Sequence, residues 1–209
     1  RWDRLADFAA FWHGIDCPAV DYTRPVLQAE TRLHVDLPDA LIEWHTRFGR
    51  YINLWSDRAF TLPNNRLRID DDTLIVRSES VFNGMLEAKW GIPIVDIESE
   101  DPHVVSILGE RTHPCADSVS EFAIYCALFD TINARHTKDI DCDNGVPFPS
   151  DGTKARFPPS FGIIKTEIYE GANWVALVSG TVWYLRRRNP ESETDHFVKH
   201  ELRTKGLPP

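Results

Sequence analysis

The sequence lacks long hydrophobic runs, paired cysteines and an excess of positive charge. No stretch reaches the roughly 18 consecutive apolar residues that would indicate a membrane-spanning helix. The N-terminal segment carries acids where a signal peptide would have its apolar stretch. The cysteines, which are Cys17, Cys115, Cys126 and Cys142, form no Cys-x-x-Cys pair, and this favours a reducing compartment. We therefore expect a cytoplasmic protein that does not enter a membrane.

The chain also lacks the charge needed to approach a nucleic acid. Its 32 Asp and Glu residues against 23 Lys and Arg residues give a formal net charge of −9 at pH 7. Such a charge repels phosphate backbones and attracts basic molecules. Direct nucleic-acid binding is therefore not expected, and the expected partner is basic.

Apolar residues are abundant enough for a folded core. They make up 42% of the 209 residues, and 11% of the residues are aromatic. This composition excludes a disordered protein. A chain of this length buries roughly 70% of the surface that its unfolded form exposes, so it can fold without disulfides or a structural metal.

Helical periodicity marks the N-terminal part of the chain and one later segment. Residues 1–13 form an amphipathic pattern, and the remainder of residues 1–30 is expected to be a linker. Residues 37–48 form a second pattern, in which Pro38 lies in the first turn, where its missing N–H is harmless. Residues 118–134 are the third predicted helix.

The third predicted helix begins with a recognisable start signal. Ser118-Val-Ser-Glu121 fits a capping box, in which the serine oxygen accepts one free amide and the glutamate reaches back to another. Phe122, Tyr125 and Phe129 then recur on one face.

Strand patterns follow the second helix. Apolar residues alternate with arginine up to Ile69, three acids make a turn, and residues 73–77 run back, which predicts a hairpin with an acidic tip. Residues 86–97 are predicted to form an edge or bulged strand, because Pro93 removes one ladder donor. Residues 103–108 are the next predicted strand.

The C-terminal third divides into a loop and a meander. Residues 136–160 are rich in Asp, Pro and Gly and are predicted to be a loop excursion. Residues 161–188 alternate with a period of two between short turns, which predicts a three-stranded meander. Helices at the two ends of a run of antiparallel strands, with more strands after them, predict an α+β fold rather than a doubly wound one. We expect one domain over residues 1–209, with a mixed, mostly antiparallel bent sheet flanked by helices.

No motif for chemistry is complete. His196 and His200 have the spacing that could bind zinc from one face of a helix, but no carboxylate follows the first histidine. The aspartates from Asp139 to Asp143 resemble the start of a calcium loop but lack glycine at its sixth position. His113-Pro114-Cys115 lacks the second thiolate of a deaminase site, and we interpret its cysteine as a loop residue. The sequence therefore predicts no catalytic residue, no cofactor and no metal site.

Several short motifs together resemble a known family. In order and approximate spacing they are similar to the SUKH superfamily, which is named for a yeast regulator of cell-wall synthesis and is best populated by bacterial immunity proteins of polymorphic toxin systems. The resemblance covers residues 37–134. The residues that carry it are Leu37, Pro38 and Trp44, then Glu79, then Trp90 and Gly91, and finally Asp101 and Pro102.

The resemblance implies an α+β fold whose sheet and helices serve as a binding surface rather than as a catalyst. From the residues alone, Trp44 and Trp90 are most simply core aromatics. Gly91 would permit a bulge, and Asp101-Pro102 a turn before a strand.

These observations predict an immunity protein that binds and neutralises a cognate bacterial toxin without chemistry, with a basic nuclease as the expected case. Acidic inhibitors are steered quickly to basic proteins. The candidate contacts form three clusters, which are Asp70, Asp71 and Asp72, then Glu98, Glu100 and Asp101, and then Asp139, Asp141 and Asp143.

Other interpretations remain open. Each acidic cluster is also compatible with simple solubility charges on a turn. The second interpretation is an intracellular regulatory or scaffold domain that binds a host protein, and the third is an enzyme with a pocket lined by Trp and His.

Overall fold

The computed structural model describes the N-terminal two thirds of the chain almost continuously and the C-terminal strands without their connections. The described residues are 2–14, 16, 21, 23–49, 59–61, 63–81, 86–133, 140–141, 153–154, 166–171, 174–179, 182–188 and 195–201. Side chains are described no further than Asp130.

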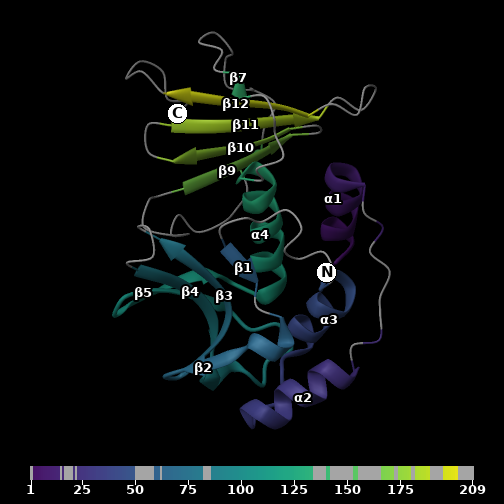
Figure 1. The fold of residues 1–209 in the computed structure, drawn as a ribbon, viewed down its shortest axis with the longest axis vertical. Helices are drawn as coiled ribbons and strands as arrows, with labels where there is room; N and C mark the ends of the chain where they lie inside the picture. Colours follow the sequence, from purple (N-terminus) through teal and green to yellow (C-terminus); the bar gives the residue numbers. More distant parts are fainter. Residues whose placement is uncertain are drawn as a thin grey trace.

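The described residues form four helices and two sheets (Figure 1). The helices are α1 (Asp3–His13), α2 (Thr23–Leu33), α3 (Asp39–Phe48) and α4 (Val119–Asn133). The first sheet contains β1 (Ala59–Thr61), β2 (Arg68–Asp70), β3 (Thr73–Val81), β4 (Leu86–Pro93), β5 (Val104–Leu108) and β6 (Arg111–Ala116), with the short 3-10 helices η1 (Asn64–Arg66) and η3 (Ile94–Asp96) between strands. The second contains β7 (Ile140–Asp141), β8 (Thr153–Lys154), β9 (Thr166–Gly171), β10 (Trp174–Ser179), β11 (Val182–Arg188) and β12 (Asp195–Glu201).

The first sheet is antiparallel throughout. Its order is β1-β3-β4-β5-β6, and β2 pairs with β3. The second sheet has the order β7-β12-β11-β10-β9-β8, and only the short β7 runs parallel to its neighbour. The α+β prediction is thus confirmed, and the predicted meander is present as β9, β10 and β11. The meander is part of a second sheet rather than an extension of the first.

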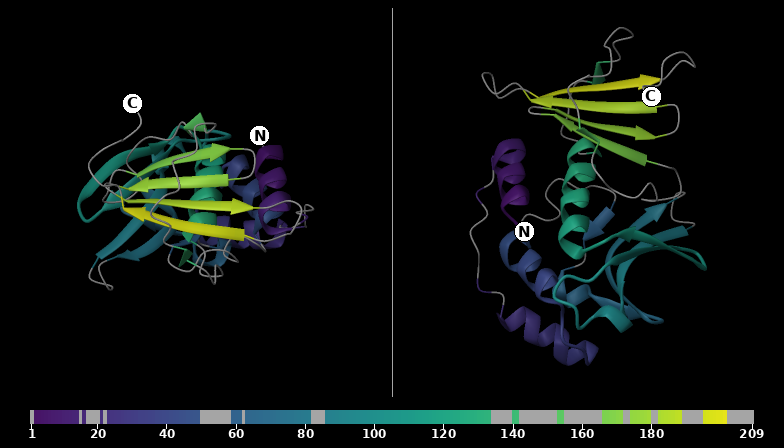
Figure 2. Two further views of the ribbon diagram at one scale, coloured as in Figure 1. Left: turned by 90° about the horizontal axis from the view of Figure 1, so that it is seen from above. Right: turned by 180° about the vertical axis from the view of Figure 1, so that it is seen from behind.

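Helix α4 lies between the two sheets. It contacts β10 and β11 of the second sheet, β6 of the first, and both α1 and α3, and the views of Figure 2 agree on this central position. Its buried residues do not keep to one face, since Phe122, Ala123, Tyr125, Cys126, Ala127 and Leu128 are all buried. A helix that is apolar nearly all round belongs to the core of a protein. The core of the described residues is therefore built around α4.

Helices α1 and α3 bury the faces that the sequence predicts. Trp2, Leu5, Ala9 and Trp12 are buried on α1 or at its start, and Leu37, Leu41, Trp44 and Phe48 are buried along α3. Helix α1 ends at Gly14, which has a left-handed φ of 62°. The Trp2 indole N–H donates to Glu43 at 2.5 Å, which ties α1 to α3. Both predicted helices are confirmed.

One buried ion pair links the first sheet to α4. The Arg77 guanidinium, from β3, donates to both carboxylate oxygens of Asp130 at 3.0 and 2.5 Å. Both side chains are buried. Burial alone would lower the pKa of Arg77, but the Asp130 carboxylate outweighs it and raises this pKa. The arginine therefore stays charged inside the core.

The prediction of a linker after residues 1–13 is wrong, because residues 23–33 form helix α2. Pro25 stands in the first turn, where it is tolerated. Only Val26 and Ala29 of this helix are buried. With so few buried apolar residues, the segment has a polar composition, and its sequence does not show the pattern of an amphipathic helix.

Two predictions about the first sheet are also corrected. Strand β4 is not an edge strand, since it pairs with both β3 and β5, and Pro93 is its last residue. The irregularity lies in β3, between Ile75 and Arg77. Cys115 lies in strand β6 rather than in a loop, and Pro114 is tolerated there because β6 is at the edge of the sheet.

The C-terminal region contains strands beyond those predicted. His196 and His200 belong to β12, so their spacing does not place them on one face of a helix. The short strands β7 and β8 fall within the predicted 136–160 loop, whose other residues lie outside the described part of the chain. In the described part, no helix has both the length and the apolar character needed to cross a membrane.

Candidate protein-binding site

The hairpin tip holds the first acidic cluster. Asp70 pairs with Thr73 across the hairpin, so Asp71 and Asp72 form the turn, and both are exposed. Asp71 has a positive φ of 51°, which aspartate tolerates better than most residues. The tip thus offers two carboxylates to a partner.

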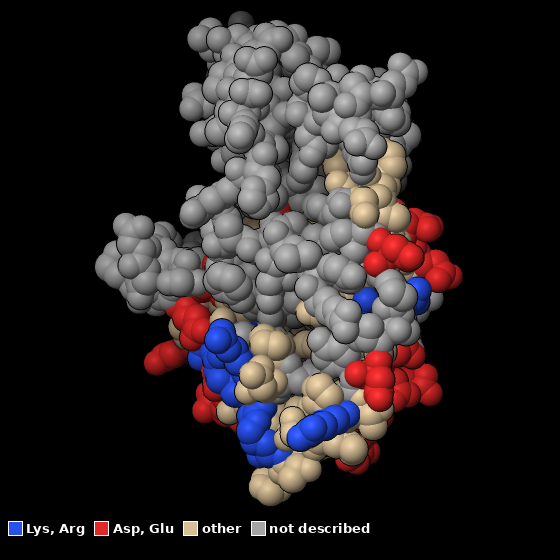
Figure 3. Space-filling model, turned by 45° about the vertical axis from the view of Figure 1, so that its right-hand side comes forward, with Lys and Arg blue, Asp and Glu red and all other residues tan. Residues whose placement is uncertain are grey.

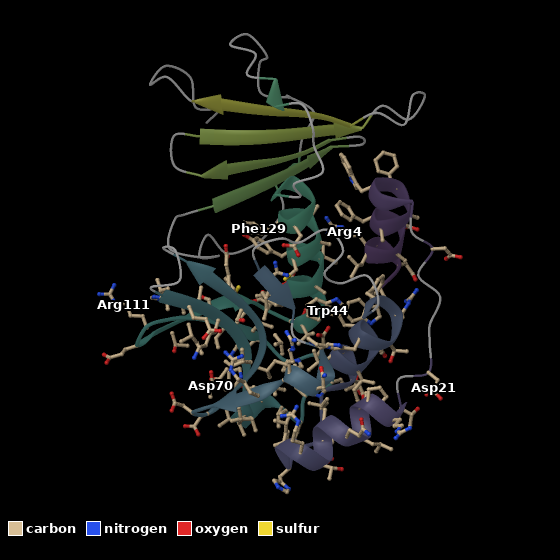
Figure 4. The ribbon with its side chains drawn as sticks, viewed as in Figure 1. Arg4, Asp21, Trp44, Asp70, Arg111 and Phe129 are labelled. Carbon is tan, nitrogen blue, oxygen red and sulfur yellow. The ribbon has the colours of Figure 1, made fainter. Side chains whose placement is uncertain are left out.

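Asp70, by contrast, is engaged within the protein. Lys89 donates to its carboxylate at 2.8 Å and Arg68 donates to the same oxygen at 3.2 Å. Burial alone would raise the pKa of Asp70, but the hydrogen bonds from Lys89 and Arg68 outweigh it and lower this pKa. Figure 4 shows Asp70 on β2, and its role there is to join β2 to β4.

In the second cluster, too, one carboxylate is engaged within the protein and the other two are exposed. The Asp101 carboxylate accepts hydrogen bonds from the backbone N–H of Ser120 at 3.0 Å and from its hydroxyl at 2.5 Å. It therefore satisfies a free amide at the start of α4 and complements the helix dipole there. Glu98 and Glu100 are exposed.

Glu98 and Glu100 line an open groove together with two aspartates from a different segment. The groove, which we call the acidic groove, has a volume of about 510 Å³ and is lined by residues 34–39 and 97–100. Its exposed carboxylates belong to Asp36, Asp39, Glu98 and Glu100. The sequence separates the two pairs by about sixty residues, as their numbering shows. The fold brings them to one place.

Hydrogen bonds from backbone N–H groups fix the two walls of the acidic groove. The Ala40 N–H, in the first turn of α3, donates to the Glu100 carbonyl at 2.9 Å. The Leu37 N–H donates to the Glu30 carboxylate at 3.0 Å, which holds the 34–39 segment against the end of α2. The carboxylates that face solvent are therefore carried by a braced backbone.

The 3-10 helix η3 connects the hairpin tip to the acidic groove. The Ile94 N–H donates to the Asp72 carbonyl at 2.9 Å, and Ile97 already lines the groove. Val95, which lies between them, is 87% exposed. A carboxylate oxygen of Asp96 lies 3.6 Å from Nδ1 of the His103 ring. We call the groove together with Asp71, Asp72, Val95 and Asp96 the acidic surface. It combines an exposed apolar residue with carboxylates on both sides.

The carboxylates of the acidic surface do not converge on one point. Among the described residues, no three His, Cys, Asp or Glu side chains are placed to hold a metal ion. Separated carboxylates can each contact a different basic side chain, which suits a protein surface with several Lys or Arg residues.

The third predicted cluster cannot be added to this surface. Asp139 and Asp143 lie outside the described residues, and of Asp141 only its backbone is described, in β7 beside Val198. Asp36, Asp39 and Val95 were not predicted. The sequence gives little sign of them, because they join the site only through the contact between the 34–39 segment and the 97–100 segment.

The residues that carry the family resemblance support the fold. Leu37, Pro38, Trp44, Trp90 and Pro102 are buried, so the prediction of core aromatics is confirmed. A Cβ atom on Gly91 would lie 2.5 Å from Thr73 Cγ2 and 2.6 Å from the Leu74 carbonyl oxygen. Gly91 thus permits close approach of β3, next to the bulge. Glu79 pairs with Ala59 across β3 and β1.

Comparisons with protein-family models, with curated proteins and with solved structures give no match to this chain. The resemblance to the SUKH superfamily therefore stays a prediction.

Proposed function

We propose that this protein is an immunity protein that binds a basic toxin through the acidic surface and blocks it without catalysis. The acidic groove is the observation that carries the proposal. It places Asp36 and Asp39 beside Glu98 and Glu100 on braced backbone. A nuclease must attract phosphate, so its active face is basic, and carboxylates of this kind can occupy the phosphate path.

The net charge of −9 supports fast capture. Charge complementarity raises association rates from a typical 10⁵–10⁶ toward about 10⁸ M⁻¹s⁻¹ at low salt. Val95, which is 87% exposed, adds an apolar contact that a basic partner would cover. The rate of binding would then depend on the salt concentration.

The proposed location is the cytoplasm. Cys115 and Cys126 are free and buried, and burial raises the pKa of the Cys115 thiol to about 12. Such thiols are inert, which suits a reducing compartment.

Co-expression tests the proposal. The chain and the product of the neighbouring reading frame are expressed together, and growth and co-purification are measured. We expect growth protection and a one-to-one complex that dissociates at high salt. A toxic neighbour that the chain neither binds nor neutralises would refute the proposal.

Matched charge reversals locate the contact. Glu98→Lys changes the acidic groove, whereas Glu110→Lys makes the same charge change at the exposed β5–β6 turn. We expect loss of protection for Glu98→Lys and full protection for Glu110→Lys. Equal effects of the two variants would show that net charge, and not the groove, is responsible.

A further inference from the structure

The outer face of α2 is a second surface, distinct from the acidic groove in its chemistry. Val26 and Ala29 face the core, while Arg24, Leu27, Gln28, Thr31 and Arg32 are exposed. A shallow depression of about 600 Å³ runs along this face. Leu27 lies in it and is 57% exposed.

This face is basic, although the chain as a whole is acidic. Arg24 and Arg32 line the depression, and its one lining carboxylate belongs to Asp21, which precedes the helix and accepts the Thr23 N–H. Glu30, the only carboxylate between Thr23 and Leu33, is half-buried and accepts the Leu37 N–H. Figure 3 shows Lys and Arg side chains gathered toward the end of the molecule at which α2 lies, while Asp and Glu occupy the margins of the same view. A basic, partly apolar helix face on an acidic protein calls for an acidic partner.

The nearest acidic surface of the right kind is the acidic groove, which begins at His34, directly after α2 ends. The basic face and the acidic groove are therefore neighbours along the chain. Arg24 and Asp36 are twelve positions apart in the numbering.

We propose that a second copy of this chain covers the outer face of α2, with the two α2 helices antiparallel about a twofold axis. In this arrangement the Arg24 end of each helix meets the acidic groove of the other copy, and the exposed Leu27 is covered by the other copy's α2. The same contact forms twice, which is how a closed, isologous dimer is built.

The pairing has consequences that separate it from simple aggregation. Because it depends on charge, it weakens as salt rises. Because it is closed, it stops at two copies. It can be tested on the purified protein alone, although it uses the same acidic groove as the proposed function.

Sedimentation equilibrium of the purified chain tests the proposal. Over a series of protein concentrations at low salt, we expect the mass to rise from 23.9 kDa toward twice that value and no further. At about 1 M salt, where the Debye length is about 3 Å, the chain should return to the monomer. A mass that stays at 23.9 kDa at every concentration would overturn the proposal.

Charge exchange identifies the contact. Arg24→Glu and Asp36→Arg should each weaken the dimer at least tenfold, and the variant that carries both changes should restore it. Arg111→Glu is the matched control, because Arg111 is exposed at the β5–β6 end of the molecule, far from α2 (Figure 4). A dimer that survives Arg24→Glu, or that the double variant fails to restore, would refute this pairing. A partner-binding assay on the same variants reports on the proposed function separately.

Discussion

At the scale of single residues, the fold depends on polar groups that are buried and satisfied. Arg77 and Asp130 are the clearest case, since both lie in the core and join β3 to α4 by two hydrogen bonds. Removing one partner of such a pair leaves a buried charge without compensation.

Arg77→Met should therefore lower the free energy of unfolding by about 3–5 kcal/mol. The double variant Arg77→Met/Asp130→Leu should recover most of this loss, because it removes both charges. Arg68→Met is the control, since Arg68 is partly exposed in its pairs with Asp70 and Glu87, and exposed pairs contribute about 0–1 kcal/mol. Denaturant unfolding measures all three, and a loss no larger for Arg77→Met than for the control would contradict this role.

His45 gives the stability a pH dependence. It is buried on α3, and within the described part its Nε2 has no hydrogen-bond partner. Burial lowers the pKa of His45 from 6.5 to about 4. In the unfolded chain the imidazole binds a proton below about pH 6.5, whereas in the folded chain it does so only below about 4, so stability falls as the pH drops between these values.

The expected loss from His45 is about 3 kcal/mol between pH 6.5 and 4. His45→Leu should remove this part of the pH dependence. Unfolding free energies across this pH range measure the difference. Parallel curves for the wild type and His45→Leu would contradict the assignment.

At the scale of elements, helix α4 depends on its N-terminal cap. The Glu121 N–H donates to the Ser118 hydroxyl at 3.1 Å, as the capping box predicts. The Glu121 carboxylate, however, accepts a hydrogen bond from the backbone N–H of Asp117 rather than from that of Ser118. Asp101 adds its bonds to Ser120.

Asp101→Ala should lower the unfolding free energy by about 0.5–2 kcal/mol, the usual range for a lost cap. Asp72→Ala, at the exposed hairpin turn, should change it by less than about 0.5 kcal/mol. Thermal or denaturant unfolding measures both. Equal, small effects would show that Asp101 is free for a partner after all.

The elements that the sequence predicts are those whose periodicity is strong. Helices α1, α3 and the hairpin of β2 and β3 have clear patterns and were predicted. Helix α2 was missed because it buries only Val26 and Ala29. Strand β6 was missed because its first four residues are exposed and include a proline.

The candidate site was only partly predictable for a different reason. Exposed acids on turns can be found in the sequence, and Glu98, Glu100, Asp71 and Asp72 were. Asp36 and Asp39 join them only through the contact between Ala40 and Glu100, which is a long-range contact. Hydrogen bonding to Lys89 and Ser120 removed Asp70 and Asp101 from the available set, and neither bond is visible in the local sequence.

At the scale of the whole molecule, two surfaces of opposite character lie near one end. The acidic groove serves both the proposed partner and the proposed second copy. A basic partner that binds the groove should therefore convert the dimer to a one-to-one complex. Sedimentation of the chain with increasing amounts of its partner measures this, and a complex that contains two copies of each chain would contradict the shared use of the groove.

The binding of the purified chain to the neighbouring gene product, measured at several salt concentrations, tests the role of the acidic surface most directly. We expect the affinity to fall with salt, and Glu98→Lys to weaken binding about tenfold, or about 1.4 kcal/mol, while Glu110→Lys changes it less than twofold. Binding that is insensitive to salt and equal for both variants would contradict the central claim.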